Sequence, residues 1–222
     1  MNTLGIVTLG QAPRSDVVPQ MRRYLPTGTR ILEAGALDGL TVHEVREFRP
    51  RPGEYVLTTR MANGESVVVS KERLMPRLRA AFQRVLQHGA DTVLLLCTGE
   101  FPELSGQALV VEPDRMLRHF VLAFRPQRLG VLIPLPEQVE EARARWSEVT
   151  PELAVAPASP YGDPNRIPQA ALELLDQEPE LIIMDCMGFQ EEHRQAVKTV
   201  TGAPTVLANA AISRLLAEVL NV

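Results

Sequence analysis

The sequence predicts an α/β protein in which mostly parallel sheets are flanked by helices. Short apolar runs alternate with amphipathic helical patterns along the 222 residues, which is the order that parallel strands joined by crossover helices require. A helix, a turn and a buried strand that ends in Cys-x-Gly occur twice, which predicts two similar halves. One Asn-Gly dipeptide, Asn63-Gly64, lies between two apolar runs and predicts a single β-hairpin with a type I′ turn in the first half.

The first half contains strands, a hairpin and four helical patterns. The predicted strands are residues 4–9, 30–34 and 92–97, with hairpin strands at 55–60 and 65–70. Ser15 is expected to cap the first helix, and Thr41 to Glu44 form a capping box that begins a short one. A longer helix with its apolar face between Leu74 and Val85 is expected to end at Gly89. Residues 116–124 predict a further helix.

The second half repeats the alternation. Its predicted strands are residues 129–133, 153–156, 181–185 and 205–208, and its helices are 136–149, 167–175, 191–201 and 212–220. Pro136 suits the first position of a helix and Gly202 suits the end of one. The pattern predicts two domains, residues 1–113 with 206–222, and residues 114–205.

Composition and charge exclude several classes of function. The formal net charge is −4 and the basic residues are spread along the chain, whereas a nucleic-acid surface needs a clustered basic face. No apolar run approaches the roughly 20 residues that cross a bilayer, and no secretory signal pattern is visible at the start. The two cysteines do not form a disulfide framework or a zinc motif. We therefore expect a cytoplasmic protein without nucleic-acid or membrane partners, a metal or a cofactor.

The two cysteines occupy matching places. Cys97 and Cys186 each follow a buried strand, and each is followed two residues later by glycine, Gly99 or Gly188. Ligands of parallel α/β sheets bind outside the carboxyl ends of the strands, and a thiol there can have a lowered pKa. Two such thiols on opposite sides of one substrate could act as a general acid and a general base. The alternative is that each cysteine is a small buried hydrophobe.

A second candidate site is the loop 10–16 after the first strand. Backbone N–H groups at a helix start, together with Arg14, would suit a carboxylate or a phosphate, and Gln11 lies in the same loop. A solvated surface arginine is the alternative. Further substrate-binding candidates lie beside the thiols or at strand ends: Thr98, Gly99, Glu100, Tyr161, Met187, Gly188 and Asn209, with Ser159 as a weaker one.

Two more residues near Cys186 have competing interpretations. Asp185 precedes the thiol and is expected to be a cap or a salt-bridge partner more often than a catalytic group. His193 lies one turn into the following helix. It could tune the thiol or act as its base, or it could simply be a solvated helix residue.

At these residues the chain resembles the AroM family over nearly its whole length. The resemblance rests on the opening 8–14 segment, the hairpin after residues 57–60, the 110–113 segment, the 184–189 block around Cys186 and the 207–209 segment. That family is similar to the aspartate/glutamate racemase superfamily. The likeness implies two pseudo-two-fold related, flavodoxin-like halves, with Cys97 and Cys186 at the two catalytic positions. The chain departs from the racemases where Thr98-Gly99 replaces Asn-Thr and Met187 replaces Thr.

Three functions are compatible with this pattern. The first is a cofactor-independent racemase, isomerase or decarboxylase that acts on a small carboxylate through Cys97 and Cys186. The second is a non-catalytic or regulatory protein that binds a small carboxylate or phosphate-bearing metabolite. The third is a hydrolase or transferase with one nucleophilic cysteine, which would need a base such as His193. A homodimer stays an open alternative.

Overall fold

The chain divides into two compact units. The computed structural model describes residues 3–101, 104 and 108–220. The first unit is Met1–Asp114 with Arg214–Val222, and the second is Arg115–Ser213. The chain thus enters the second unit at the start of one helix, α4 (Pro113–Phe124), and returns to the first within another, α8 (Ala208–Leu220).

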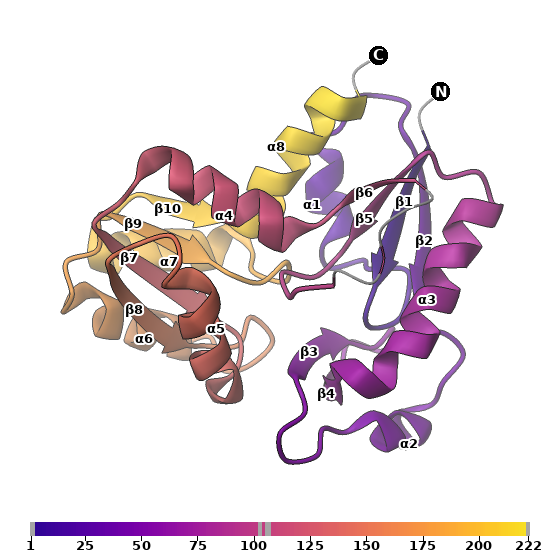
Figure 1. Ribbon diagram of the computed structural model, residues 1–222, viewed down its shortest axis with the longest axis horizontal. Coiled ribbons are helices and arrows are strands. Elements are labelled where there is room, and N and C mark those ends of the chain that lie inside the picture. Colours follow the sequence, from indigo (N-terminus) through magenta and orange to yellow (C-terminus); the bar gives the residue numbers. More distant parts are fainter. Residues whose placement is uncertain (1–2, 102–103, 105–107, 221–222) are drawn as a thin grey trace. The chain divides into compact units, whose positions relative to one another are not determined.

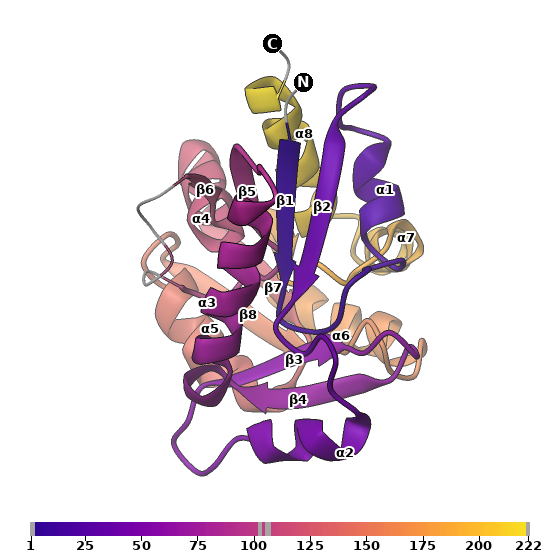
Figure 2. The ribbon, with the colours of Figure 1, turned by 90° about the vertical axis from the view of Figure 1, so that its right-hand side faces the viewer.

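The first unit is built on a four-stranded parallel sheet. Its order is β2-β1-β5-β6, from β1 (Thr3–Thr8), β2 (Arg30–Gly35), β5 (Thr92–Leu95) and β6 (Leu109–Val111). Helix α3 (Lys71–Gln87) covers one face, and α1 (Val18–Arg22) lies on the other (Figure 1; Figure 2). Every residue of β1 and β5 is buried, as expected for strands covered on both faces.

The second unit contains the other parallel sheet. Its order is β10-β9-β7-β8, from β7 (Arg128–Ile133), β8 (Glu152–Pro157), β9 (Leu181–Met184) and β10 (Thr205–Leu207). Helices α4 and α5 (Val139–Trp146) lie on one face, and α6 (Arg166–Leu175) and α7 (Glu191–Thr201) on the other (Figure 1). A short 3-10 turn, η3 (Pro136–Gln138), precedes α5 and begins with the proline that the sequence indicated.

The internal repeat is visible in the strand order. Reading each sheet from its outer strand gives β2-β1-β5-β6 and β8-β7-β9-β10, so the predicted α/β class with parallel sheets is confirmed. The central strands also share a glycine, Gly5 and Gly130, at matching register positions. A Cβ on Gly5 would lie 2.9 Å from Val85 of α3, and one on Gly130 would lie 3.1 Å from Ile182 and 3.5 Å from Leu174 of α6. The helix that precedes β5 or β9, α3 in the first unit and α6 in the second, therefore packs directly on the glycine of the central strand, β1 or β7.

A hairpin subdomain interrupts the winding of the first unit. It consists of α2 (Val42–Val45), the 3-10 turn η1 (Arg46–Phe48), and the antiparallel pair β3 (Val56–Arg60) and β4 (Ser66–Ser70). The predicted capping box is present, since the Thr41 side chain accepts from Glu44 N–H and the Glu44 carboxylate accepts from Thr41 N–H. The hairpin lies beside the carboxyl end of β1, because the Gln11 N–H donates to Arg60 O of β3 at 3.1 Å.

Two local predictions were wrong and one short strand was missed, each for an identifiable reason. The hairpin turn is not type I′, because Gly64 alone has positive φ and Met61 bonds to Glu65; this is a three-residue loop with a glycine bulge. Ser15 does not cap α1, which begins at Val18 without a side-chain cap. The Arg14 carbonyl instead accepts from the N–H groups of residues 17 and 18. The short edge strand β6 was not anticipated, because its three residues carry no alternating pattern.

Gly5→Ala is expected to lower the free energy of unfolding by about 1–3 kcal/mol, because the added methyl overpacks the contact with Val85. Gly162→Ala is the matched control, since its added Cβ would meet only Ser159 at 3.5 Å. Urea unfolding followed by far-UV circular dichroism measures both. Equal midpoints for Gly5→Ala and wild type would contradict the close-packing explanation.

Candidate functional site

The first thiol lies in a tight turn at the end of β5. The Leu96 N–H still bonds to Val7 O of β1, and the Cys97 N–H then turns back to Leu95 O at 2.9 Å. Two residues later the Gly99 N–H donates to Cys97 Sγ at 3.3 Å. The side chain of Cys97 is half-buried. The sulfur is thus held by a backbone donor.

The second thiol repeats this geometry in the second unit. The Asp185 N–H bonds to Leu132 O of β7, and the Cys186 N–H turns back to Met184 O at 3.0 Å. The Gly188 N–H donates to Cys186 Sγ at 3.4 Å, and Cys186 is also half-buried. We call these segments, residues 97–99 and 186–188, the two thiol turns. Each follows the strand beside the central one, at the position where the strand order of its sheet reverses, which is where such sheets bind ligands.

A tyrosine hydroxyl covers the glycine of each thiol turn. A Cβ on Gly188 would lie 2.1 Å from the Tyr161 hydroxyl oxygen, and a Cβ on Gly99 would lie 3.2 Å from that of Tyr55. The sequence indicated Tyr161 but not Tyr55, which directly precedes a hairpin strand. Tyr55 lies in the segment after edge strand β2, and Tyr161 lies in the segment after the matching edge strand β8. The internal repeat is therefore the sequence signal that could have identified Tyr55 from Tyr161.

Asn209, the second residue of α8, forms hydrogen bonds to the backbone of the second thiol turn. Its Nδ2 donates to Met187 O at 3.1 Å and to Phe189 O at 2.7 Å, and the residue is 2% exposed. Met187 is buried as well. The side-chain amide of Asn209 therefore positions the turn that carries Cys186.

Gln11 joins the loop after β1 to two other segments. Its Nε2 donates to Leu37 O at 3.1 Å and to Leu40 O at 2.7 Å, while its Oε1 accepts from Ala62 N–H at 2.9 Å. The adjacent Gly10 lies against the hairpin, because a Cβ on it would lie 2.1 Å from Arg60 O. The Gln11 amide thus fixes the conformation of loop 10–16, which the sequence indicated as a candidate carboxylate-binding site.

Arg14 is 4% exposed and forms an internal ion pair. Its guanidinium donates to both oxygens of Asp16, at 2.9 and 2.8 Å, and to Thr8 Oγ1 at 2.9 Å. Burial alone would raise the pKa of Asp16, but the hydrogen bond and charge of Arg14, aided by Arg60, hold that pKa below its ordinary value. The charge of Arg14 is therefore balanced where it lies, and it stabilises the loop.

Asp185 is a salt-bridge partner, as the sequence favoured. Its carboxylate lies 2.8 Å from Arg145 Nη2 and accepts from Trp146 Nε1 at 2.8 Å. Both partners lie on or at the end of α5. The residue before Cys186 thus ties the end of β9 to the helix covering its sheet.

The remaining candidates divide into turn residues and flanking residues. Ser159 Oγ accepts from Tyr161 N–H at 3.2 Å and so shapes the loop that presents that tyrosine. Thr98 is buried and Glu100 is half-buried on either side of Gly99. Among the residues that the structure describes, no group of His, Cys, Asp and Glu side chains could hold a metal ion. In the same residues no helix is long and apolar enough to cross a membrane.

His193 caps α7. Its Nδ1 accepts from Gln190 N–H at 3.0 Å, and its ring meets the edge of Phe189 at 5.9 Å between centroids. Burial lowers the pKa of His193 despite the charge of Glu192. Since an accepting Nδ1 carries no proton, this contact belongs to the neutral imidazole, and the helix cap depends on it.

Comparisons with known proteins agree with this architecture. A model of the AroM protein family matches residues 4–220, whereas no curated protein matches. An allantoin racemase from Klebsiella pneumoniae has a TM-score of 0.67 at 11% identity, covering 100% of this chain and 88% of its own. A maleate isomerase from Pseudomonas putida S16 has a TM-score of 0.63 at 12% sequence identity, and the match covers 100% of this chain and 93% of the isomerase chain. A glutamate racemase from Bacillus anthracis has a TM-score of 0.68 at 12% sequence identity, and the match covers 99% of this chain and 82% of the racemase chain. These similarities establish the shared fold.

His193→Gln is expected to flatten the loss of stability between pH 7 and pH 5. The folded state depresses the pKa of His193 below its ordinary 6.5, so its contribution is present above pH 6.5 and is lost as the pH falls. Glutamine keeps an acceptor for the cap but does not titrate. Urea unfolding at several pH values measures the slope, with His119→Gln on α4 as control. Identical slopes for His193→Gln and wild type would refute the assignment.

Proposed function

The chain belongs to the AroM family, and from that premise we propose a racemase- or isomerase-like enzyme that acts on a small carboxylate without a cofactor. The observation that carries the proposal is the duplicated thiol turn. Cys97 and Cys186 end equivalent strands, turn back by the same backbone bond, and accept from the glycine two residues later. Two thiols at equivalent positions of the two units suit a racemization, because its forward and reverse directions each need one acid and one base of the same kind.

The proposed reaction is a proton exchange at one carbon. One cysteine, as thiolate, takes the proton from the carbon beside the carboxylate, and the electron pair of that C–H bond moves into the carboxylate to form an enediolate. The other cysteine, as thiol, gives its proton to the opposite face of the same carbon. The two sulfurs have then exchanged protonation states, and no electron is gained or lost. Acid–base groups of this kind contribute about 10²–10⁴-fold to a rate.

The residues of the two turns supply different parts of the site in this proposal. In this proposal Thr98 and the Tyr161 hydroxyl bind carboxylate oxygens, while the Gly99 and Gly188 N–H groups hold the sulfurs. Gln11, Arg14 and Asn209 act through their hydrogen bonds inside each unit, as positioning residues. Solved structures of similar fold include proteins described as racemases and isomerases, and they support this class of reaction. His193 donates nothing to Cys186 in the described contacts, which favours the thiol pair over a cysteine–histidine nucleophile.

Cys97→Ser and Cys186→Ser are each expected to reduce turnover by about 10²-fold or more, because serine is a far weaker acid and base than cysteine near neutral pH. The assay is exchange of the α-proton in D2O, followed by proton NMR over a panel of small carboxylates with an sp3 α-carbon that includes aspartate and glutamate. Unchanged thermal midpoints control for folding. Exchange that persists in both variants at the wild-type rate would rule out the acid–base pair.

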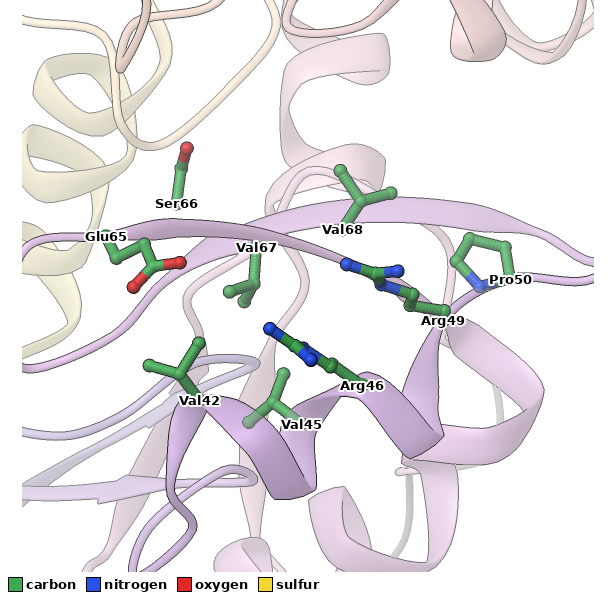
Figure 3. A pocket seen from close by; sticks show the side chains of 9 residues that line it. All are labelled: Val42, Val45, Arg46, Arg49, Pro50, Glu65, Ser66, Val67 and Val68. Carbon is green, nitrogen blue, oxygen red and sulfur yellow. The ribbon is translucent and has the colours of Figure 1, made fainter.

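Binding without turnover is the second candidate, and one cavity favours it. A hollow of about 470 Å³ lies between α2, η1 and β4, with a valine-lined floor made by Val42, Val45 and Val67. Arg46 and Arg49 extend over it (Figure 3). Within the described residues neither guanidinium has an ion-pair or hydrogen-bond partner, and Glu65 lies at the rim. Apolar walls with a surplus of positive charge suit a small anion with an apolar body.

The variant pair Arg46→Gln and Arg49→Gln tests this binding candidate. Benzoate and phenyl phosphate at millimolar concentration are expected to raise the thermal midpoint of wild type by mass action, and each variant should weaken the effect several-fold. Arg22→Gln, on α1, is the control. If neither compound shifts the wild-type midpoint, or if the variants respond as wild type does, the cavity is not an anion site.

A further inference from the structure

The cavity between α2, η1 and β4 lies against the same apolar core as the first thiol. We call it the hairpin cavity. Val45, on its floor, belongs to the buried core of the first unit, and so does Leu57 of β3. Val42 and Val67, which also line the cavity, pack against that core, as does Cys97. The cavity and the Cys97 turn are thus joined by continuous packing within one unit.

The β3–β4 hairpin contacts both places with one face. Thr59 pairs with Val67, and Leu57 lies two residues before Thr59 on β3. Residues two apart on a strand project to the same face, and so do paired residues of neighbouring antiparallel strands. Val67 points from β4 toward α2 and lines the cavity (Figure 3), whereas a Cβ on Gly99 would lie 3.4 Å from Leu57 Cδ2. The hairpin therefore rests on α2 and on the thiol turn at the same time.

The loop after β1 fastens this face of the hairpin. Gln11 accepts from the Ala62 N–H of the hairpin loop through Oε1, and it donates to Leu40 O, just before α2, through Nε2. A Cβ on Gly10 would lie 2.6 Å from Thr59 Oγ1. One side-chain amide thus bridges the segments that lead into β4 and into α2, which are two walls of the cavity.

The hairpin depends on these contacts for its stability. Two-stranded hairpins are marginally stable in water unless they pack against a further element, and β3 and β4 form a sheet of their own. The contacts of the inner face with α2, with the thiol turn and with the loop after β1 therefore open together, as one local event. When they open, the cavity loses a wall and Gly99 loses its contact with Leu57.

We infer that the hairpin cavity is an effector site for the Cys97 turn. A small anion with an apolar body binds only to the docked hairpin, because the apolar walls of the cavity come from both α2 and β4. Bound ligand stabilises the docked form by mass action and thereby keeps the turn that carries Cys97 closed. This inference rests on the binding candidate of the proposed function and adds regulation to it.

The two arginines over the cavity select the charge of the effector. Arg46 and Arg49 extend over its valines (Figure 3), and Glu65 at the rim forms no ion pair with either of them in the described part of the chain. An anionic group placed toward the guanidiniums gains charge-assisted hydrogen bonds. An uncharged ligand of the same shape has only the apolar walls and should act much more weakly.

Alkylation of Cys97 with and without ligand tests the effector site. Benzoate is the probe and benzamide is its uncharged control, both at constant ionic strength, and thermal titration gives the Kd of benzoate. Iodoacetamide labels the thiol, and mass spectrometry of the peptides gives the rate at Cys97. Because the thiol reacts through the open hairpin, the rate in wild type is expected to fall about tenfold at a benzoate concentration of about ten times the Kd.

The variants separate the cavity from the thiol. Arg46→Gln and Arg49→Gln should each remove most of the slowing at the same benzoate concentration, whereas Arg22→Gln, on α1, should respond as wild type does. Leu57→Val shortens the side chain that meets Gly99, so it should raise the Cys97 rate several-fold without ligand, and benzoate should lower that rate again. Far-UV circular dichroism verifies that each variant is folded.

Four outcomes would overturn the effector site. Slowing that persists in both Arg46→Gln and Arg49→Gln would mean that benzoate blocks the thiol directly, and equal slowing by benzamide would remove the role of charge. A thermal shift with an unchanged or higher rate at Cys97 would refute the effector site and leave the binding candidate intact, whereas absence of any thermal shift would refute both. All four are separate from the acid–base pair, because alkylation needs no turnover.

Discussion

The N–H group of the glycine that follows each cysteine is the contact on which the candidate site depends. At Gly99 and Gly188 this group reaches back to the sulfur two residues earlier, and the space where a side chain would project is taken by a tyrosine hydroxyl. Any larger residue would displace the hydroxyl. The glycines therefore set both the direction of the thiol and the position of its polar neighbour.

Two amide side chains connect separate segments by hydrogen bonds, one at the second thiol turn and one at the loop after β1. Asn209 clamps two carbonyls of one turn, and Gln11 joins three segments beside the first sheet. Groups that are oriented before a ligand arrives need no reorganisation when charge develops. In the proposed reaction these hydrogen bonds therefore contribute by fixing the positions of the groups around the two half-buried sulfurs.

Hydrophobic periodicity was sufficient to predict the parallel sheets, because buried strands and amphipathic helices leave clear local patterns. It also located both cysteines at strand ends. Local pattern did not predict the strand β6 or the uncapped start of α1, whose form depends on contacts with distant segments. The same limit applies to Gln11 and Arg14: residue type suggested ligand binding, whereas their partners are brought close only by folding.

Tyr55 illustrates what a single sequence conceals. Nothing near it in the chain marks it as a site residue, and the sequence indicated it only as the start of a hairpin strand predicted at 55–60. The structure brings it to Gly99 as Tyr161 is brought to Gly188, so two unlike connections supply the same group. Comparing the two units with each other, rather than reading either alone, identifies it.

The described contacts of the two thiol turns differ: Gly99 lies against the Tyr55 hydroxyl, whereas the 186–188 segment lies against Tyr161 and is hydrogen-bonded by Asn209 of α8. Mutations that retune one sulfur can therefore accumulate without disturbing the other. In the proposed mechanism, a duplicated unit begins with two identical acid–base groups, and each is free to diverge. The handedness and direction of such a reaction can then change through substitutions in one unit.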